Sequence, residues 1–338
     1  MTVDRPELSM QPTNRPAMTD YIDAGLRQLA SRLRSATVVL CAFACTAAFA
    51  APKAPTAPAQ RTFASAEEAA SALVEALKKG DRAALVAVLG KEADGSLSSG
   101  DKVADRITAE RFIARYETKH AIVADGDSRA TLTIDADDFP FAFPLVKTAS
   151  RWRFDAKAGN AELLARRVGE NELAVMNVLL AIVDAQREYA SQDRDGNRAP
   201  EYAARFASTP GKKDGLYWPT SAGEPPSPLG TLVARAAGQG YKRAGGPTPY
   251  HGYYFLLLKG QGANARGGAY DYTVKGRTIG GFGVVAYPAK YANSGVMTFI
   301  VNHDGVVYQK DLGADTANVA RGITRFDPGP GWKALSIQ

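Results

Sequence analysis

The sequence predicts an α+β protein built from two modules, and three observations support this prediction. Apolar residues recur at helical spacing over 64–79 and 161–190, which is typical of amphipathic helices. Runs rich in β-branched or aromatic residues, such as 131–134 and 252–258, indicate strands. The chain has 338 residues, of which 45% are hydrophobic and 22% charged. This length and balance suit about two globular domains.

The first fifty residues carry the features of an export signal. Arg27, Arg32 and Arg34 precede an apolar stretch over 36–50 that ends in small residues at Ala48 and Ala50. The apolar stretch is shorter than the about 20 residues that a membrane-spanning helix needs. We therefore expect cleavage near Ala50, a periplasmic or secreted protein, and no transmembrane helix in the mature chain.

The start of the chain and its cysteines fit the same interpretation. Residues 1–17 have no structural pattern, and a start at Met18 would give a signal of ordinary length. Both cysteines, Cys41 and Cys45, lie inside residues 1–50, so the mature chain is expected to have no disulfide and no thiolate metal site. A lipoprotein acylated at Cys45 is the alternative. The Pro/Ala-rich stretch 51–60 then predicts a linker.

The charge pattern argues against a nucleic-acid partner. The formal net charge is +6, and the basic residues are scattered, with runs no longer than pairs such as Lys78-Lys79. Nucleic-acid binding requires basic residues that cluster on one face. We expect a mildly basic solvated surface instead.

The first module, residues 61–160, is expected to hold helices followed by an antiparallel sheet. Ser65 can cap the first helix, and the third helix is expected to start at Thr108 and to end near His120. The expected helices span 64–79, 82–89 and 108–119, and the expected strands span 131–134, 139–146 and 150–155. Three short helices before a curved antiparallel sheet resemble the NTF2-like fold by element order alone.

The second module, residues 161–333, is expected to pair one long helix with a four-stranded antiparallel sheet. The helix over 161–190 is apolar over a wide arc, so it should be covered on more than one side. Gly252–Leu258 is apolar on both faces and suggests a central strand, whereas Asp304-Gly305 predicts a hairpin. The other expected elements are a short helix at 229–238 and strands over 281–287, 296–302 and 306–311.

Several motifs of the second module support a family resemblance. They include Glu170-Asn171-Glu172-Leu173, Tyr250-His251-Gly252-Tyr253-Tyr254-Phe255 and the run from Gly281 to Pro288. Over nearly all of residues 61–333 the chain resembles a family of bacterial exported proteins, the domain-of-unknown-function family numbered twenty-nine-fifty. That family has no assigned activity, so the resemblance implies export and architecture and supplies no catalytic residues.

The second module also resembles the globular part of type II secretion pseudopilins and other pilin-like proteins. In those proteins a long helix lies against an antiparallel sheet, and a loop with Asp, Gly and Asn follows the helix. Their helix stands at the extreme N-terminus and anchors the protein in the membrane. The helix expected here over 161–190 is internal, which argues against pilus assembly by that route.

One loop has the composition of a calcium site. Asp193, Asp195, Asn197 and Glu201 place oxygen-bearing side chains close together in sequence, and Ca²⁺ takes about 6–8 oxygen ligands. The spacing is not that of an EF-hand, because Gly196 comes too early. The alternative is that Asp and Asn close a turn through their own backbone. We expect no other cofactor.

Catalytic motifs are scarce. The three histidines, His120, His251 and His303, are not spaced as metal ligands, and the chain has neither a His-Glu-x-x-His motif nor a Gly-x-Ser-x-Gly elbow. We therefore assign no catalytic residue. His251 can line a cleft or can be an ordinary polar loop residue.

The loops of the second module carry many aromatic residues. Trp218, Tyr250, His251 and Tyr270 are the candidate ligand-binding residues, because such rings stack on sugars or anchor protein partners. The alternative is that these rings belong to the core. The sequence favours a non-catalytic binding or scaffold protein whose partner is an envelope protein or a glycan. The alternatives are a periplasmic hydrolase with a His251-centred site, completed by Asp271 or Asp193, and a calcium-stabilised structural protein.

Overall fold

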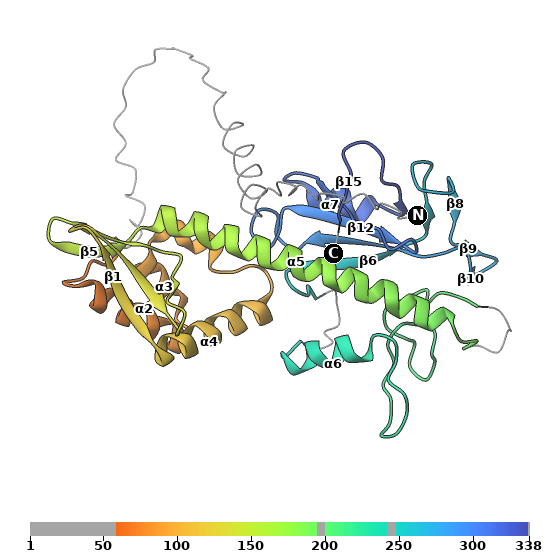
Figure 1. Cartoon of the computed structure of the whole chain (residues 1–338), viewed down its shortest axis with the longest axis horizontal. Helices are drawn as coiled ribbons and strands as arrows, with labels where there is room; N and C mark the ends of the chain where they lie inside the picture. Colours follow the sequence, from red (N-terminus) through yellow and green to blue (C-terminus); the bar gives the residue numbers. More distant parts are fainter. Residues whose placement is uncertain (1–58, 195–199, 242–247, 337–338) are drawn as a thin grey trace, which may run out of the picture. The chain divides into compact units, whose positions relative to one another are not determined.

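The computed structural model describes residues 59–194, 200–241 and 248–336. These residues form mainly antiparallel sheets and helices around two main hydrophobic cores. One long helix, α5 (Ala156–Ala190), runs beside both main sheets (Figure 1). Its side chains belong to one core and pack against the other. The α+β fold class is therefore confirmed.

The first module begins with the expected helices. Ser65 caps α2 (Ala66–Lys79), because its hydroxyl accepts a hydrogen bond of 3.0 Å from the backbone N–H of Glu68. Gly80 ends the helix in the left-handed conformation with φ of 61°. Next come α3 (Arg82–Leu89), a short 3₁₀ helix η1 (Lys91–Ser96) and α4 (Lys102–Thr118).

The predicted start of α4 at Thr108 is wrong. The helix starts at Lys102, because the carboxylate of Asp101 accepts hydrogen bonds from the backbone N–H groups of Val103 and Ala104. No residue of α4 is fully buried, and Tyr116 is half-buried. An N-terminal cap thus adds nearly two turns to a helix whose apolar periodicity is weak.

His120 begins a strand instead of ending a helix. Its ring stacks on Tyr116 with centroids 3.8 Å apart, and its Nδ1 lies 2.9 Å from the Tyr116 carbonyl oxygen. The strand that the sequence prediction missed, β1 (His120–Asp125), pairs along its whole length with β2 (Arg129–Ile134). The two form a hairpin through Gly126, whose φ is 68°.

The first sheet has the order β1-β2-β4-β5, with β3 beside β2. The predicted single strand over 139–146 is divided into β3 and β4, because Pro140 and Pro144 lack the N–H that a continuous ladder requires. Phe143, Leu145 and Phe154 are fully buried between this sheet and α2. The strands are β1 (His120–Asp125), β2 (Arg129–Ile134), β3 (Phe139–Pro140), β4 (Leu145–Thr148) and β5 (Arg151–Phe154).

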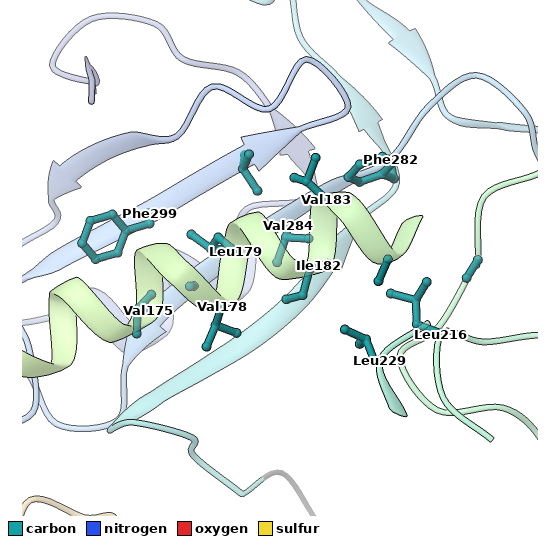
Figure 2. Packing of buried hydrophobic residues seen from close by; sticks show 14 of the residues in the cluster. Val175, Val178, Leu179, Ile182, Val183, Leu216, Leu229, Phe282, Val284 and Phe299 are labelled. Atoms are coloured by element: carbon teal, nitrogen blue, oxygen red, sulfur yellow. The ribbon is translucent and has the colours of Figure 1, made fainter. Parts of the chain in front are cut away.

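The second sheet has the order β15-β13-β12-β11-β6, so it has five strands where four were expected. The added strand, β15, comes from the C-terminal end of the described chain. Helix α5 covers one face, where Val175, Leu179 and Ile182 meet Val284 and Phe299 (Figure 2). The strands are β6 (Tyr253–Leu258), β11 (Gly283–Pro288), β12 (Met297–Asn302), β13 (Tyr308–Asp311) and β15 (Lys333–Ala334).

The predicted central position of β6 is wrong, because this strand lies at the edge of the sheet. The strand that is buried along its whole length is β11, between β6 and β12. Side chains of β6 contribute to a core on each face: Phe255 packs with α5 and Leu258 packs on the opposite side. The apolar residues on both faces of β6 therefore indicate that both faces are covered. They do not indicate how many strands lie beside it.

The opposite face of the second sheet carries elements that were not predicted. Helix α7 and strand β14 contact β11, and Phe326 of β14 is buried there with Val285 and Ile300. The smaller elements are α6 (Gly230–Gly238), α7 (Thr316–Gly322), β7 (Gly260–Gln261), β8 (Tyr270–Asp271), β9 (Thr273–Val274), β10 (Arg277–Thr278) and β14 (Arg325–Phe326). Within the described ranges, no helix combines the length and the apolar character needed to cross a bilayer.

Two glycines of α5 give a direct test of how this helix docks on the first sheet. A methyl group at Gly159 would lie 2.7 Å from the Cα of Phe143, whereas nothing lies within 4 Å of a methyl group at Gly169. We expect Gly159→Ala to lower the free energy of unfolding by roughly 1–3 kcal/mol through overpacking. Gly169→Ala should raise it by about 0.5–1 kcal/mol, because alanine favours the helix.

Denaturant unfolding of the two variants, followed by circular dichroism, measures both effects. Equal stability of Gly159→Ala and Gly169→Ala would contradict the close approach of α5 to Phe143.

Candidate functional site

A tight turn before β6 presents His251. Tyr250 and Tyr253 exchange backbone hydrogen bonds of 2.9 and 3.1 Å, which leaves His251 and Gly252 as the two corner residues. Their φ angles are 49° and 71°. Positive φ at both corners is the pattern of a type I′ turn; it is uncommon in residues other than glycine, although histidine adopts it more often than most. The backbone thus holds His251 in a strained position.

The turn is tied to the start of α4 by the buried carboxylate of Asp101, which is 2% exposed. Its Oδ1 caps α4, and its Oδ2 accepts hydrogen bonds from the Tyr241 hydroxyl (2.7 Å) and from the Gly252 backbone N–H (3.2 Å). The helix N-terminus and these donors offset the cost of burying the charge. Asp101 therefore fixes the turn and Tyr241 to the first module.

Burial sets the ionisation of the groups around this turn. It lowers the pKa of His251 below 6.5, which the charges of Asp101 and Glu170 oppose and that of Arg235 reinforces. Burial, followed by the hydrogen bond to Asp101, raises the pKa of Tyr241 above its usual 10.0. The imidazole and the phenol of Tyr241 are therefore uncharged at neutral pH.

A shallow groove runs beside α6. Its volume is about 480 Å³. The lining residues carry aromatic, hydroxyl or small apolar side chains and no charge at neutral pH: Tyr217, Trp218, Pro219, Thr220, Pro226, Ser227, Gly230, Thr231, Val233, Ala234 and Ala237. Such a lining suits a neutral ligand that offers both apolar faces and hydrogen-bonding groups.

One polar atom in this groove lacks a partner among the described residues. Ser227 is 3% exposed, and its buried Oγ makes no hydrogen bond within the described residues. A buried hydroxyl without a partner costs free energy unless another group satisfies it. Ser227 lines the groove but its Oγ is covered, so a ligand bound there can supply that group once the residues over the hydroxyl shift.

Trp218 forms one side of the groove but is mostly covered by the protein. It is 7% exposed, and the guanidinium of Arg194 and the ammonium of Lys213 lie 5.0 and 5.6 Å from the centre of its ring system. Tyr189 packs edge-on against it. A ligand in the groove therefore meets a rigid edge of Trp218 and not an open ring face.

The four predicted ligand-binding residues do not form one site. Tyr250 and His251 lie at the turn, where the charge of Arg235 on α6 acts on both, and Trp218 lines the groove beside α6. Tyr270 belongs to another cluster, in which it packs against Tyr272 and its hydroxyl lies 3.5 Å from the Nε2 of His303. Helix α6 is thus the element that three of the four residues share.

The predicted calcium residues are only partly covered by the structure. Asp195 and Asn197 lie outside the described residues, so the calcium site stays a prediction. Glu201 forms an ion pair of 2.5 Å with Arg277. Across residues 59–194, 200–241 and 248–336 there is no group of three or more His, Cys, Asp or Glu side chains arranged to hold a metal ion.

The central turn of α5 carries polar residues that the sequence prediction did not single out. The Arg167 guanidinium donates to the Ser96 carbonyl oxygen and to the Asn293 side chain, both at 2.7 Å. Glu172 accepts hydrogen bonds of 2.9 Å from the backbone N–H groups of Val296 and Met297. Burial raises the pKa of Glu172, which these backbone donors oppose. Both side chains connect distant segments of the protein.

One of the missed residues has a signal in the sequence. Asp101 is an N-cap residue type placed just before Lys102 and Val103, so the cap was readable from the sequence. Ser227 has no such signal, because its significance depends on the groove that α6 forms with residues 217–227.

The fold and the site define an α+β protein in which the carboxylates of Asp101 and Glu172 bind backbone atoms of the protein itself. The chain belongs to the family described as a protein of unknown function (DUF2950), whose family model matches residues 60–335. The resemblance to that family is confirmed. No curated protein and no solved structure matches the chain, and the NTF2-like and pilin-like resemblances stay predictions.

The lowered pKa of His251 predicts a pH dependence of stability. Between that pKa and 6.5 the folded state binds fewer protons than the unfolded state, so the free energy of unfolding should fall as the pH drops through this window. His251→Asn removes the titrating group and keeps a residue that tolerates positive φ next to Gly252. We expect this variant to be at least as stable as the wild type at pH 7.5, with a weaker loss of stability toward pH 5.

Denaturant unfolding at several pH values measures the difference between the two proteins, which isolates His251 from His120 and His303. Parallel stability curves for the wild type and His251→Asn would contradict the lowered pKa.

Proposed function

We propose that this chain is an exported, non-catalytic binding protein that holds a neutral oligosaccharide of the cell envelope in the groove along α6. The observation that carries the proposal is the buried Oγ of Ser227, which lines the groove without a partner among the described residues. A ligand hydroxyl would satisfy this atom.

The rest of the lining supports a neutral sugar over a charged ligand. Tyr217 offers aromatic surface, Trp218 adds a rigid ring edge, and Thr220 and Thr231 offer further hydroxyls. Sugars present apolar ring faces together with hydroxyl groups, which such side chains match. A charged ligand would lose its hydration in this groove without gaining an opposite charge.

Export rests on the sequence. The apolar stretch 36–50 follows three arginines and ends in Ala48-Phe49-Ala50, the pattern of a cleaved signal peptide. Both cysteines fall inside the segment that cleavage would remove. We propose that the mature protein is periplasmic or secreted, with lipid attachment at Cys45 as the alternative.

A hydrolase with a His251-centred site is the second candidate. The observation in its favour is a neutral imidazole that a strained turn holds in place. The negative charges of Asp101 and Glu170 act on its pKa. The predicted carboxylate partner Asp271 instead forms an ion pair of 2.5 Å with Arg325. Asp101 is the buried carboxylate that could take the place of Asp271, but it already accepts a hydrogen bond from the backbone N–H of Gly252.

Variants of the groove test the binding proposal on a glycan array with the full-length chain. Ser227→Ala should leave the free energy of unfolding equal to or above that of the wild type, because the buried hydroxyl has no intramolecular partner among the described residues and its burial costs free energy. The same variant should weaken glycan binding by roughly 5–10-fold, the effect of one lost hydrogen bond.

Ala234→Phe should abolish binding, because Ala234 is exposed and lines the groove. Ala114→Phe, at an exposed alanine of α4, is the matched control and should bind like the wild type. The proposal is wrong if no neutral glycan on the array binds, or if Ala234→Phe binds as well as the control.

Calcium stabilisation by Asp193, Asp195, Asn197 and Glu201 makes a separate prediction. If these residues hold Ca²⁺, added calcium should raise the melting temperature and EDTA should lower it, because the ion binds only the folded state. Asp195→Asn should reduce this shift. A melting temperature that neither calcium nor EDTA changes would rule out the site.

A further inference from the structure

One wall of the groove is formed by α6, a short helix whose own burial holds it only weakly. Gly230, Thr231, Val233, Ala234 and Ala237 of this helix line the groove. None of the residues of α6 is fully buried, and its nine residues are too few for a helix that is stable by itself. The position of this wall therefore depends on what holds the two ends of α6.

The N-terminal end of α6 is tied to the segment that forms the other wall. Leu229, which directly precedes α6, is buried in the core around α5, and its backbone N–H donates to the Leu216 carbonyl oxygen at 2.9 Å. Leu216 in turn directly precedes residues 217–220, which line the groove opposite α6. The two walls are therefore held together at this end of the helix.

The C-terminal end of α6 is held by the first module instead. Arg106 of α4 donates through its Nη2 to the Gln239 carbonyl oxygen at 2.9 Å. The Tyr241 hydroxyl donates to the Oδ2 of Asp101 at 2.7 Å. A methyl group at Gly240 would lie 2.8 Å from the Nη2 of Arg106, so the guanidinium lies directly against this segment. Asp101 and Arg106 thus form a clamp on residues 239–241.

The clamped residues are joined to the last turn of α6 by backbone hydrogen bonds. Gly240 has a φ of 96°, and its N–H donates to the Ala237 carbonyl oxygen at 2.9 Å. The N–H of Tyr241 donates to the Ala236 carbonyl oxygen at 3.0 Å. These two bonds around a left-handed glycine form a Schellman motif, which closes the end of a helix. Because Ala237 also lines the groove, the clamp holds the groove wall itself.

We propose that Asp101 and Arg106 are positioning residues of the groove, which set its width through the C-terminal end of α6. The proposal rests on the proposed function, because it assigns these residues to the same ligand site. Neither residue lines the groove, so both act on a ligand through α6 and not by contact. Without the clamp, the Ala237 end of α6 leaves its place in part of the molecules. The apparent affinity for a ligand then falls with the fraction of molecules whose wall is in place.

Spin labels placed across the groove test the clamp without any ligand. The full-length chain with Cys41→Ser and Cys45→Ser has no cysteine left, so Thr220→Cys and Ala237→Cys can be labelled in this background. Both positions are exposed, and they lie on the two opposite walls of the groove. The distance between the labels, measured by electron paramagnetic resonance, therefore reports the width of the groove at the clamped end of α6.

The test variant combines Arg106→Ala with Tyr241→Phe, which removes both side-chain hydrogen bonds of the clamp and leaves the Asp101 cap of α4 intact. The label distance should become longer and more broadly distributed, because the end of α6 is no longer held. Each single substitution should give part of this effect. Circular dichroism shows whether the variants stay folded.

The matched control combines Arg111→Ala with Tyr291→Phe. It removes another arginine of α4 and another hydrogen bond between a tyrosine and an aspartate, at residues that do not line the groove. This control should keep the wild-type distance. The proposal is overturned if the test variant and both of its single variants keep that distance as well.

Glycan affinity, measured on the unlabelled full-length chain, gives the second measurement. For a neutral glycan that binds the wild type, the variant with Arg106→Ala and Tyr241→Phe should bind roughly five- to tenfold more weakly. The matched control should bind like the wild type, and equal affinity of the two variants would overturn the positioning role. If no glycan binds the wild type, the proposed function fails, and the label distances still decide whether the clamp sets the width of the groove.

Discussion

The structure depends on the central turn of α5, where a long helix changes from one hydrophobic core to the other. Arg167 and Glu172 are partly buried there and are hydrogen-bonded to groups of η1 and of residues 293–297. Charged groups in such surroundings are tolerated only when partners replace the lost water. Removing one side chain would leave the backbone donors or acceptors of the other segments unpaired.

The His251 turn rests on the same part of α5. A methyl group at Gly252 would lie 2.7 Å from the Asn171 side-chain nitrogen, and Asn171 itself donates to the Ser294 carbonyl oxygen. Only glycine therefore fits this corner of the turn. Asp101 then ties the corner to α4, so the helix, the cap and the turn hold one another in place. This arrangement accounts for a strained histidine next to an obligatory glycine.

Local patterns in the sequence predicted local structure well. Periodicity and caps gave α2, α3, α6 and the body of α5, and Asp304-Gly305 marked the hairpin between β12 and β13. The order of the strands was not predictable in this way. The residues of β6 are apolar because both faces of the strand are covered, and this says nothing about which strands lie beside it. The start of α4 was missed because Asp101 stands among Ser and Gly residues typical of loops.

The candidate site was predictable only in part. Three of the predicted residues lie near α6. Trp218 lines the groove beside this helix, and the charge of Arg235 on α6 acts on Tyr250 and His251. The groove itself depends on how residues 217–227 pass α6, and no periodicity encodes such a path. Ser227 is a candidate because its Oγ has no hydrogen-bond partner among the described residues. A sequence pattern does not reveal such a missing partner.

The separation in sequence between α5 and its sheet has a consequence for the order of folding. Val175 and Leu179 share a core with Val284 and Phe299, more than a hundred residues later in the chain. Such high contact order delays folding, since the entropy of closing a long loop must be overcome before the contacts form. The second core cannot close until β12 has been synthesised. Under the proposed export, this delay would give the chain time to cross a membrane before it folds.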